Sequence, residues 1–265
     1  MNRLNLCLLA GWALSTILAA RATAADIPVN CGDNLNVPGG SYVLTGNLTC
    51  TFAPAVHITA NNVHFDLKGF TLSRTGSAMG AGIITAAGSS CVATSGVHIY
   101  NGKITNFGTA ISICVPGSPT ATHAHINDMT LTANGSGIGL LSGSDNDIHN
   151  NEITNNNVSG VGFFAGVGIF ASASNGNQIK DNVVNVNGSD GMRLSGSNSN
   201  HISGNTTDMN RESGIHIEKP AARNLVVGNK AHHNISFDLA DDNPNCGSND
   251  WDNNSFGSKS QACIQ

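Results

Sequence analysis

The sequence contains few charged residues. Asp, Glu, Lys and Arg make up 11% of the 265 residues, whereas about 25% is usual for globular domains. This scarcity excludes helical bundles and coiled coils, which need many Glu and Lys beside Ala and Leu. The net charge is only −5 and hydrophobic residues reach 40%. Composition therefore also excludes a charge-driven disordered protein and a basic nucleic-acid binder, and we expect no nucleic-acid partner.

Long apolar runs are absent after residue 24. Residues 1–24 have the pattern of a secretory signal peptide, with Arg3 at the start, a mostly apolar stretch from Leu4 to Ala20, and the small-residue site Ala22-Thr23-Ala24. The alternative is an uncleaved anchor helix. We predict cleavage before Ala25, a secreted or periplasmic location, and no membrane span in the mature chain, because no other segment approaches 18 apolar residues.

Cysteine pairs of the C-x-x-C type are also absent, which argues against a cysteine metal site. Loss of Cys7 with the signal leaves six cysteines, and an even number in an exported protein implies disulfides. Six cysteines allow 15 pairings, of which the simplest joins sequence neighbours. The predicted disulfides are Cys31–Cys50, Cys91–Cys114 and Cys246–Cys263. The first and last would seal the two ends of a repeat structure.

Gly and Asn are abundant instead, with 31 and 35 residues, and they belong to a repeat. The template N-x-I-x-x-N-x-I-x-x-N begins at Asn146, Asn177, Asn200 and Asn224, and a third short alternating segment follows each copy. Three short strands in each unit of about 23 residues are typical of an all-β, parallel β-helix. We expect about eight coils in a single domain, with Asn at corners and in amide ladders between coils.

Three stretches carry a family resemblance: Cys31 to Leu72 as an opening coil, Gly96-Val-His-Ile-Tyr-Asn-Gly-Lys-Ile104 as a second coil, and Trp251 to Ile264 as a closing cap. They resemble right-handed parallel β-helix proteins of the pectate-lyase-like superfamily, in particular the exported β-helix-repeat proteins of bacteria. The resemblance implies a single-stranded right-handed parallel β-helix over residues 25–265 with disulfide-stapled caps. It also raises polysaccharide lyases, epimerases and hydrolases, and periplasmic proteins linked to copper-enzyme maturation.

The motifs of those enzymes are missing. The sequence has no D-P-H-E of mannuronan epimerases, no G-H-G with R-I-K of polygalacturonases, and no R-x-P-x-x-R of calcium pectate lyases. No catalytic residue is therefore transferred by motif, and the site must be argued from the repeat itself.

Outward residues of the third strands form the first candidate site. Aligning these strands gives one column, which contains Ser112, Gly139, Gly168, Arg193, His216 and Asp238, with Glu218 at the next outward position. We assign catalytic roles to Arg193, His216, Glu218 and Asp238, and substrate binding to Asp190, Arg211 and Lys219. These lie in the cationic part of the chain, which also holds Lys180, Arg223 and Lys230.

Two chemistries fit this column. Arg193 could stabilise the enolate-like intermediate of uronate elimination or epimerisation, with His216 as a base of near-neutral pKa. Alternatively, Glu218 and Asp238, at roughly 8 Å, could serve as the carboxyl pair of a glycoside hydrolase. The competing interpretation is an ordinary solvated strand face with weak salt bridges.

Outward residues of the first strands form a second column, which contains His64, His98, His125, Asp147, Gln178 and His201. Its first three histidines, about 4.8 Å apart at the backbone, are candidate ligands for copper or zinc; the alternative is polar filler. Calcium could bind the acidic stretch Asp238-Leu-Ala-Asp241-Asp242, although its spacing favours a solvated turn. The sequence requires no cofactor.

We therefore predict an exported β-helix protein that binds, and could cleave or epimerise, an acidic extracellular polysaccharide. The alternative is a non-catalytic structural, adhesive or copper-handling protein. Whether it is an enzyme, its substrate and its oligomeric state are left open by the sequence.

Overall fold

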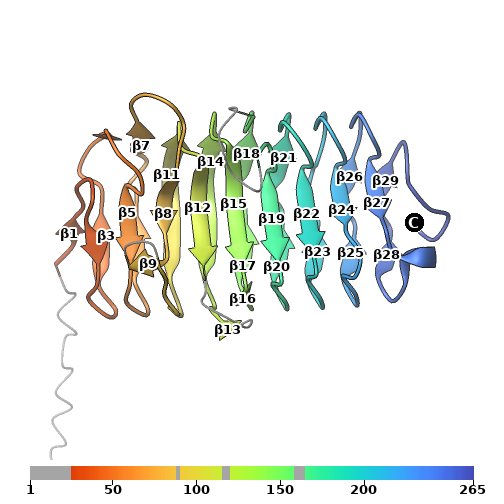
Figure 1. The fold of residues 1–265 in the computed structure, drawn as a ribbon, viewed down its shortest axis with the longest axis horizontal. Helices are drawn as coiled ribbons and strands as arrows, with labels where there is room; N and C mark the ends of the chain where they lie inside the picture. Colours follow the sequence, from red (N-terminus) through yellow and green to blue (C-terminus); the bar gives the residue numbers. More distant parts are fainter. Residues whose placement is uncertain (1–24, 88–89, 115–119, 158–164) are drawn as a thin grey trace, which may run out of the picture.

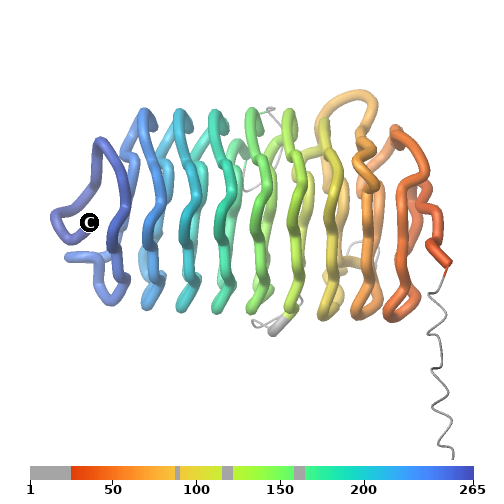
Figure 2. Tube along the Cα trace, turned by 180° about the vertical axis from the view of Figure 1, so that it is seen from behind, coloured from red at the N-terminus to blue at the C-terminus, as the bar shows by residue number. Residues whose placement is uncertain are grey.

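The protein is a rod of stacked β-coils (Figures 1 and 2). The computed structural model describes residues 25–87, 90–114, 120–157 and 165–265. Within them the chain winds coil by coil from one end of the rod to the other, and the single helical turn is a short 3-10 segment, η1 (Pro244–Cys246). The predicted right-handed parallel β-helix is confirmed. No helix of the described chain is long and apolar enough to cross a membrane.

Sheet A, the larger of two long sheets, has 14 strands. Its path runs through β1 (Ile27–Pro28), β3 (Ser41–Val43), β6 (His64–Asp66), β11 (His98–Thr105), β14 (His125–Thr132), β17 (Asp147–His149), β20 (Gln178–Lys180), β23 (His201–Ser203), β25 (Leu225–Val227) and β28 (Asp250–Asp252). Beside this path lie β4 (Leu48–Cys50), β7 (Thr71–Arg74), β18 (Glu152–Thr154) and β21 (Val183–Asn185).

Sheet B has nine parallel strands, each from a successive coil. They are β2 (Asn34–Leu35), β5 (Val56–Ile58), β8 (Ala81–Ile84), β12 (Thr109–Cys114), β15 (Ser136–Leu141), β19 (Ile169–Ser172), β22 (Met192–Ser195), β24 (Ile215–Ile217) and β27 (Leu239–Asp241). Three short pairs complete the strands: β9 (Ala86–Ala87) with β10 (Ser90–Cys91), β13 (Thr120–Ala121) with β16 (Gly143–Ser144), and β26 (Lys230–Ala231) with β29 (Ser255–Phe256).

Apolar columns fill the inside of the rod. Ile148, Ile179, Ile202 and Val226 pair in register along sheet A, and each is completely buried. Burial of such a side chain contributes about 1.5–3 kcal/mol relative to its exposure. The alternation of the template thus places every second residue of a strand in the core and leaves the intervening residue on the outer face.

Three ladders of buried Asn side chains stabilise the coil corners. In each ladder an Asn donates its backbone N–H and its Nδ2 to the Oδ1 of the Asn one coil further on. In the ladder through Asn151, Asn182, Asn205, Asn229 and Asn254, all eight of these distances are 3.0 Å. The second ladder contains Asn146, Asn177, Asn200, Asn224 and Asn249. The third contains Asn134, Asn156, Asn187, Asn210 and Asn234. The predicted amide ladders are therefore present.

The third ladder ends at a carboxylate. Asp238 Oδ1 accepts hydrogen bonds from Asn234 N at 3.1 Å and Asn234 Nδ2 at 2.9 Å. Its Oδ2 accepts from the backbone N of Gly257 at 2.9 Å and of Ser258 at 2.8 Å. Asp238 is only 3% exposed, so this side chain joins the last ladder rung to the C-terminal cap.

Acid should loosen this cap. Burial opposes the charged form of Asp238, but the hydrogen bonds from Asn234, Gly257 and Ser258 outweigh it and lower the pKa below 3.8. The resulting stabilisation is present above pH 3.8 and is lost as the pH falls through the lowered pKa of the folded state. We expect Asp238→Asn to reduce the melting temperature at pH 7 and to flatten its decline in acid, measured by circular dichroism. An acid decline of unchanged steepness would contradict this role.

All three predicted disulfides are present. Cys31–Cys50, Cys91–Cys114 and Cys246–Cys263 have Cα–Cα separations of 5.6, 5.2 and 6.0 Å. Each disulfide joins cysteines that are near in sequence, so all three agree with coils that stack in the order of the chain. The last disulfide ties η1 to the C-terminal segment.

The predicted register of the third strands is wrong on two coils. Phe170, not Gly168, pairs with Gly139 and with Arg193. Ala240, not Asp238, pairs with His216. The true outward column of sheet B is therefore Ser112, Gly139, Phe170, Arg193, His216 and Ala240.

Close approach of neighbouring coils explains the error. Gly168 lies against Gly137, and a Cβ atom on Gly137 would meet the Gly168 carbonyl oxygen at 2.4 Å. These glycines therefore align with each other rather than with the outward column. Val167, Ile169 and Ala171 are all buried, so alternation alone does not separate two registers that differ by two residues.

Candidate functional site

Two basic side chains lie side by side on the outer face of sheet B. Arg193 in β22 and His216 in β24 are paired residues of adjacent coils. Arg193 Nε contacts Asp190 Oδ2 at 2.9 Å and Glu218 Oε1 at 3.2 Å. The structure thus brings together Arg193, His216 and Glu218, as the repeat predicts.

Asp190 is the buried centre of this cluster. Its side chain is 1% exposed. Oδ1 accepts from the Ser213 backbone N at 2.8 Å, while Oδ2 lies 2.9 Å from Arg193 Nε and 3.4 Å from His216 Nδ1. A carboxylate so enclosed holds its neighbours in place. The substrate-binding role predicted for Asp190 stays a prediction, and its contacts with Arg193 and His216 suit a positioning residue.

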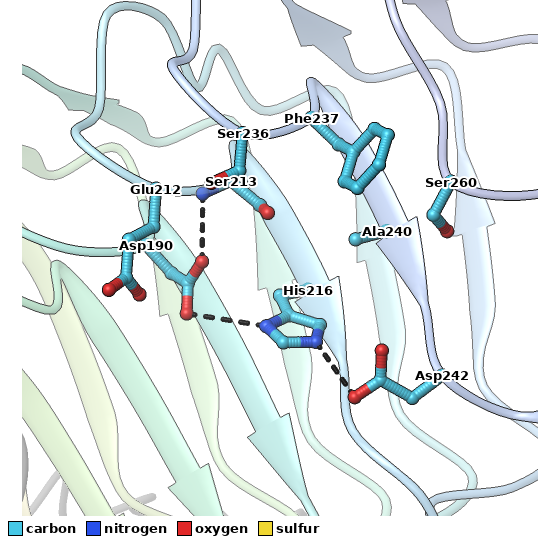
Figure 3. A pocket seen from close by; sticks show the side chains of 9 residues that line it. All are labelled: Asp190, Glu212, Ser213, His216, Ser236, Phe237, Ala240, Asp242 and Ser260. Carbon is cyan, nitrogen blue, oxygen red and sulfur yellow. Dashed lines mark hydrogen bonds and ion pairs between the residues drawn. The ribbon is translucent and has the colours of Figure 1, made fainter.

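His216 is held between two carboxylates. Nδ1 faces the buried Asp190, and Nε2 lies 3.1 Å from Oδ2 of Asp242, whose side chain is 53% exposed (Figure 3). Burial of the ring disfavours its charge, but the hydrogen bonds and negative charges of Asp190 and Asp242 outweigh burial and raise the pKa of His216 from 6.5 to about 9. The ring is protonated at neutral pH. A ring charged at neutral pH can donate a proton, whereas the sequence predicts a base of near-neutral pKa; the catalytic role of His216 stays a prediction.

The charged ring should make stability depend on pH. Its pKa is higher in the folded state than its ordinary value, so the stabilisation is complete below about pH 6.5 and is lost as the pH rises toward 9. A shift of this size corresponds to about 3 kcal/mol. We expect urea denaturation to show this loss in the wild type but not in His216→Gln, whose side chain does not titrate. Equal pH dependence in both proteins would contradict the assigned charge state.

A pocket of about 250 Å³ opens beside His216. Figure 3 shows its lining, which comprises Asp190, Glu212, Ser213, His216, Ser236, Phe237, Ala240, Asp242 and Ser260. The small Ala240 follows His216 in the outward column, and this leaves room above the sheet. Ser260 comes from the C-terminal cap, so the pocket lies where the last coil meets that cap.

Other predicted site residues lie outside this pocket. Arg211 and Lys219 are exposed and form no ion pair with any residue of the described chain. Asp238 is the buried end of a ladder, so the carboxyl pair Glu218 and Asp238 does not form on one face. Lys180 pairs with Asp147 on sheet A, at 3.1 Å. The cations that are near in sequence are therefore distributed over several faces.

The sequence places Asp242 only in the candidate calcium stretch and not beside His216. Ile217 pairs with Asp241, so the next residues, Glu218 and Asp242, follow equivalent positions of adjacent coils. The correct third-strand register would have placed both carboxylates beside His216. Glu212, Ser213 and Phe237 lie on the turns before the strands, where the template provides no alternation.

The chain matches the family model described as periplasmic copper-binding protein (NosD) over residues 51–261. This match covers most of the chain. The chain belongs to the NosD family. The description places the family in the periplasm, and the three disulfides fit an oxidising compartment. A comparison with curated protein sequences finds no match.

Solved structures similar to this NosD-family chain are β-helix proteins of low sequence identity. The Dettilon tailspike protein has 17% identity and a TM-score of 0.59, over 79% of this chain and 43% of the tailspike. DFA-IIIase from Arthrobacter chlorophenolicus A6 has 17% identity and a TM-score of 0.50, over 81% and 53%. A mutant of the periplasmic alginate epimerase AlgG has 13% identity and a TM-score of 0.53, over 88% and 70%. The chain thus spans about half the length of the first two, and all three support the fold.

The histidine column of sheet A is present as predicted. His64, His98 and His125 pair in register, and their rings meet edge to face with centroids 5.8 and 5.9 Å apart. Burial, aided by the neighbouring imidazoles and opposed by a hydrogen bond with Asn127, lowers the pKa of His98. These side chains form a ladder of separate rings rather than a set that converges on one point.

The residues present do not fit a preformed copper centre, which the NosD family description implies. Copper needs several imidazole or sulfur ligands around one position. Within the described residues, no group of three or more His, Cys, Asp or Glu side chains is placed to hold a metal ion. The six cysteines of residues 25–265 are in disulfides. The metal role of the histidine column stays a prediction.

Proposed function

We propose that the protein, exported after cleavage before Ala25, binds an extracellular polysaccharide on the outer face of sheet B and hydrolyses it at His216. The observation that carries this proposal is the position of His216, a charged proton donor between a buried and an exposed carboxylate at the wall of an open pocket. The name of one structural neighbour, an alginate epimerase, agrees with a carbohydrate polymer as the partner.

The geometry suits hydrolysis assisted by a general acid. His216 Nε2 would transfer its proton to the glycosidic oxygen as the bond from that oxygen to the anomeric carbon breaks. A water oxygen would bond to the anomeric carbon, and its proton would pass to the carboxylate of Glu218. Asp190 would keep His216 oriented through Nδ1. Displacement of Asp242 by the substrate would lower the pKa of His216 toward the range useful for proton transfer.

Elimination and epimerisation are less well supported by this geometry. Both need a base and a cation free to neutralise a uronate. His216 is protonated, and Arg193 Nε already contacts two carboxylates. The acidic polysaccharide that we predict from sequence remains one class to be tested beside neutral polymers.

The test is incubation of the mature protein with a panel of polyuronates and neutral polysaccharides, with and without EDTA. Hydrolysis predicts new reducing ends without unsaturated products, detected by a reducing-end assay, absorbance and proton NMR. Absorbance from unsaturated chain ends would instead indicate that the protein cleaves by elimination and not by hydrolysis. No binding to any polymer, together with copper binding that is lost on substitution of His64, His98 and His125, would favour the metal-handling alternative.

A further inference from the structure

We infer that the pocket beside His216 is a subsite for one uncharged sugar ring, whose apolar face packs on Phe237. The inference rests on the proposed function and specifies its substrate class. It replaces the acidic sugar predicted from sequence by a neutral, hydroxyl-rich one. Four features of the pocket carry it: its size, an unpartnered hydroxyl, its charge and an exposed aromatic ring.

The size of the pocket suits one ring. Its volume is about 250 Å³, which lies below the range of about 300–1,000 Å³ that is typical for drug-sized ligands. The lining combines hydroxyl and carboxylate groups with the apolar Phe237 and Ala240. A sugar ring has the same combination, with hydroxyls around its edge and C–H groups on its faces.

A hydroxyl group faces this pocket without a partner. Ser213 is 4% exposed and lines the pocket. Its backbone N donates to Asp190, but its Oγ forms no hydrogen bond with any residue of the described chain. Because this oxygen lies at the pocket and is not bonded to the protein, it can form a hydrogen bond with a ligand hydroxyl.

The charge of the pocket opposes an acidic ligand. Its ionisable lining residues are the carboxylates of Asp190, Glu212 and Asp242 and the imidazolium of His216. Asp190 is paired with Arg193 at 2.9 Å, so two negative charges and one positive charge remain and their sum is −1. Carboxylates accept hydrogen bonds from sugar hydroxyls, whereas they repel the carboxylate of a uronate.

Phe237 supplies the apolar wall. Its side chain is 40% exposed although it is a large hydrophobic residue, and in Figure 3 its ring lies above Ala240 at the edge of the pocket. Packing of the ring against the C–H face of a sugar would remove apolar area from water. The exposed position of this phenylalanine is then explained by the ligand.

Titration calorimetry with matched oligosaccharides tests the inference. The probes are mannose and mannuronate oligomers, and galactose and galacturonate oligomers, of equal length and linkage, so that each pair differs only at C6. We expect the wild type to bind the neutral member of at least one pair at least about tenfold more tightly. Oligomers with blocked ends distinguish a terminal ring from an internal one. Tighter binding of the uronates would overturn the inference.

Two sets of variants complete the test. Phe237→Ala should weaken binding of the neutral oligomer about tenfold or more, and Phe237→Trp should preserve it. Phe52→Ala is the matched control, because Phe52 is 47% exposed at the other end of the rod. Glu212→Gln should reduce the preference for the neutral member. Unchanged binding by Phe237→Ala would refute the inference while polymer binding in the panel still supports the proposed function. If no polymer and no oligomer binds, both the inference and the proposed function are refuted.

Discussion

Replacement of Asn205 by alanine is expected to lower the free energy of unfolding by about 3–5 kcal/mol. Asn205 is completely buried. Its Oδ1 accepts from Asn182 N and Nδ2, each at 3.0 Å, and its Nδ2 donates to Asn229 Oδ1 and to the Ile179 carbonyl oxygen. The substitution would leave buried donors and an acceptor without partners, which is far more costly than loss of an exposed amide.

Urea denaturation measures this effect, and Asn36→Ala is the control because Asn36 is exposed. We expect the control to change stability by less than about 0.5 kcal/mol. Asn205→Asp tests whether the side chain at this position must donate a hydrogen bond to the next Asn of the ladder. A carboxylate can still accept from Asn182 but cannot donate to Asn229, so this variant should regain stability in acid, where aspartic acid provides a donor. Equal stability of the Asn205→Ala and Asn36→Ala variants would contradict the structural importance of the ladder.

Replacement of His216 by glutamine is expected to reduce turnover of a polysaccharide substrate by about 10²-fold or more. Glutamine keeps a hydrogen-bonding side chain but cannot transfer a proton at neutral pH. Asp190→Asn should also reduce turnover, and in addition it should lower the pKa of His216, measured by NMR of the ring. That change distinguishes positioning by Asp190 from a merely structural role.

Two controls accompany this prediction. His201→Gln alters an exposed histidine of sheet A, and the triple variant of His64, His98 and His125 alters the candidate metal column on the same sheet. Both should retain turnover, and circular dichroism should show native folding of all variants. If His216→Gln retains wild-type turnover, His216 is not the proton donor of the reaction. Loss of turnover only in the triple variant would assign the activity to sheet A.

Most of the fold could be predicted from the sequence because the same signal recurs on several coils. The spacing of Asn in the template corresponds directly to the ladders, as in Asn182 and Asn205, and the intervening Ile179 and Ile202 form the core. The local disulfides follow from the linear order of the coils. The third-strand register was less well determined, because buried residues on both sides of Gly168 allow two alignments.

The site could be predicted only in part. Arg193 and His216 follow from strand register, which the repeat encodes. The protonation of His216 depends on Asp190 and Asp242, which approach it from a turn and from an adjacent coil. Such positions carry no periodic signal. The cations of this part of the chain do not share one face for the same reason, since nearness in sequence does not determine on which face of a coil a side chain such as Lys180 lies.

The most direct test of the central claim is binding of the mature protein to an array of immobilised neutral and acidic polysaccharides, with NMR observation of the His216 ring. We predict retention on at least one polymer, a shift of the His216 resonances on addition of its soluble fragment, and weaker retention of Phe237→Ala. Retention without any change at His216, or no retention on any polymer, would contradict the assignment of this pocket as a polysaccharide site.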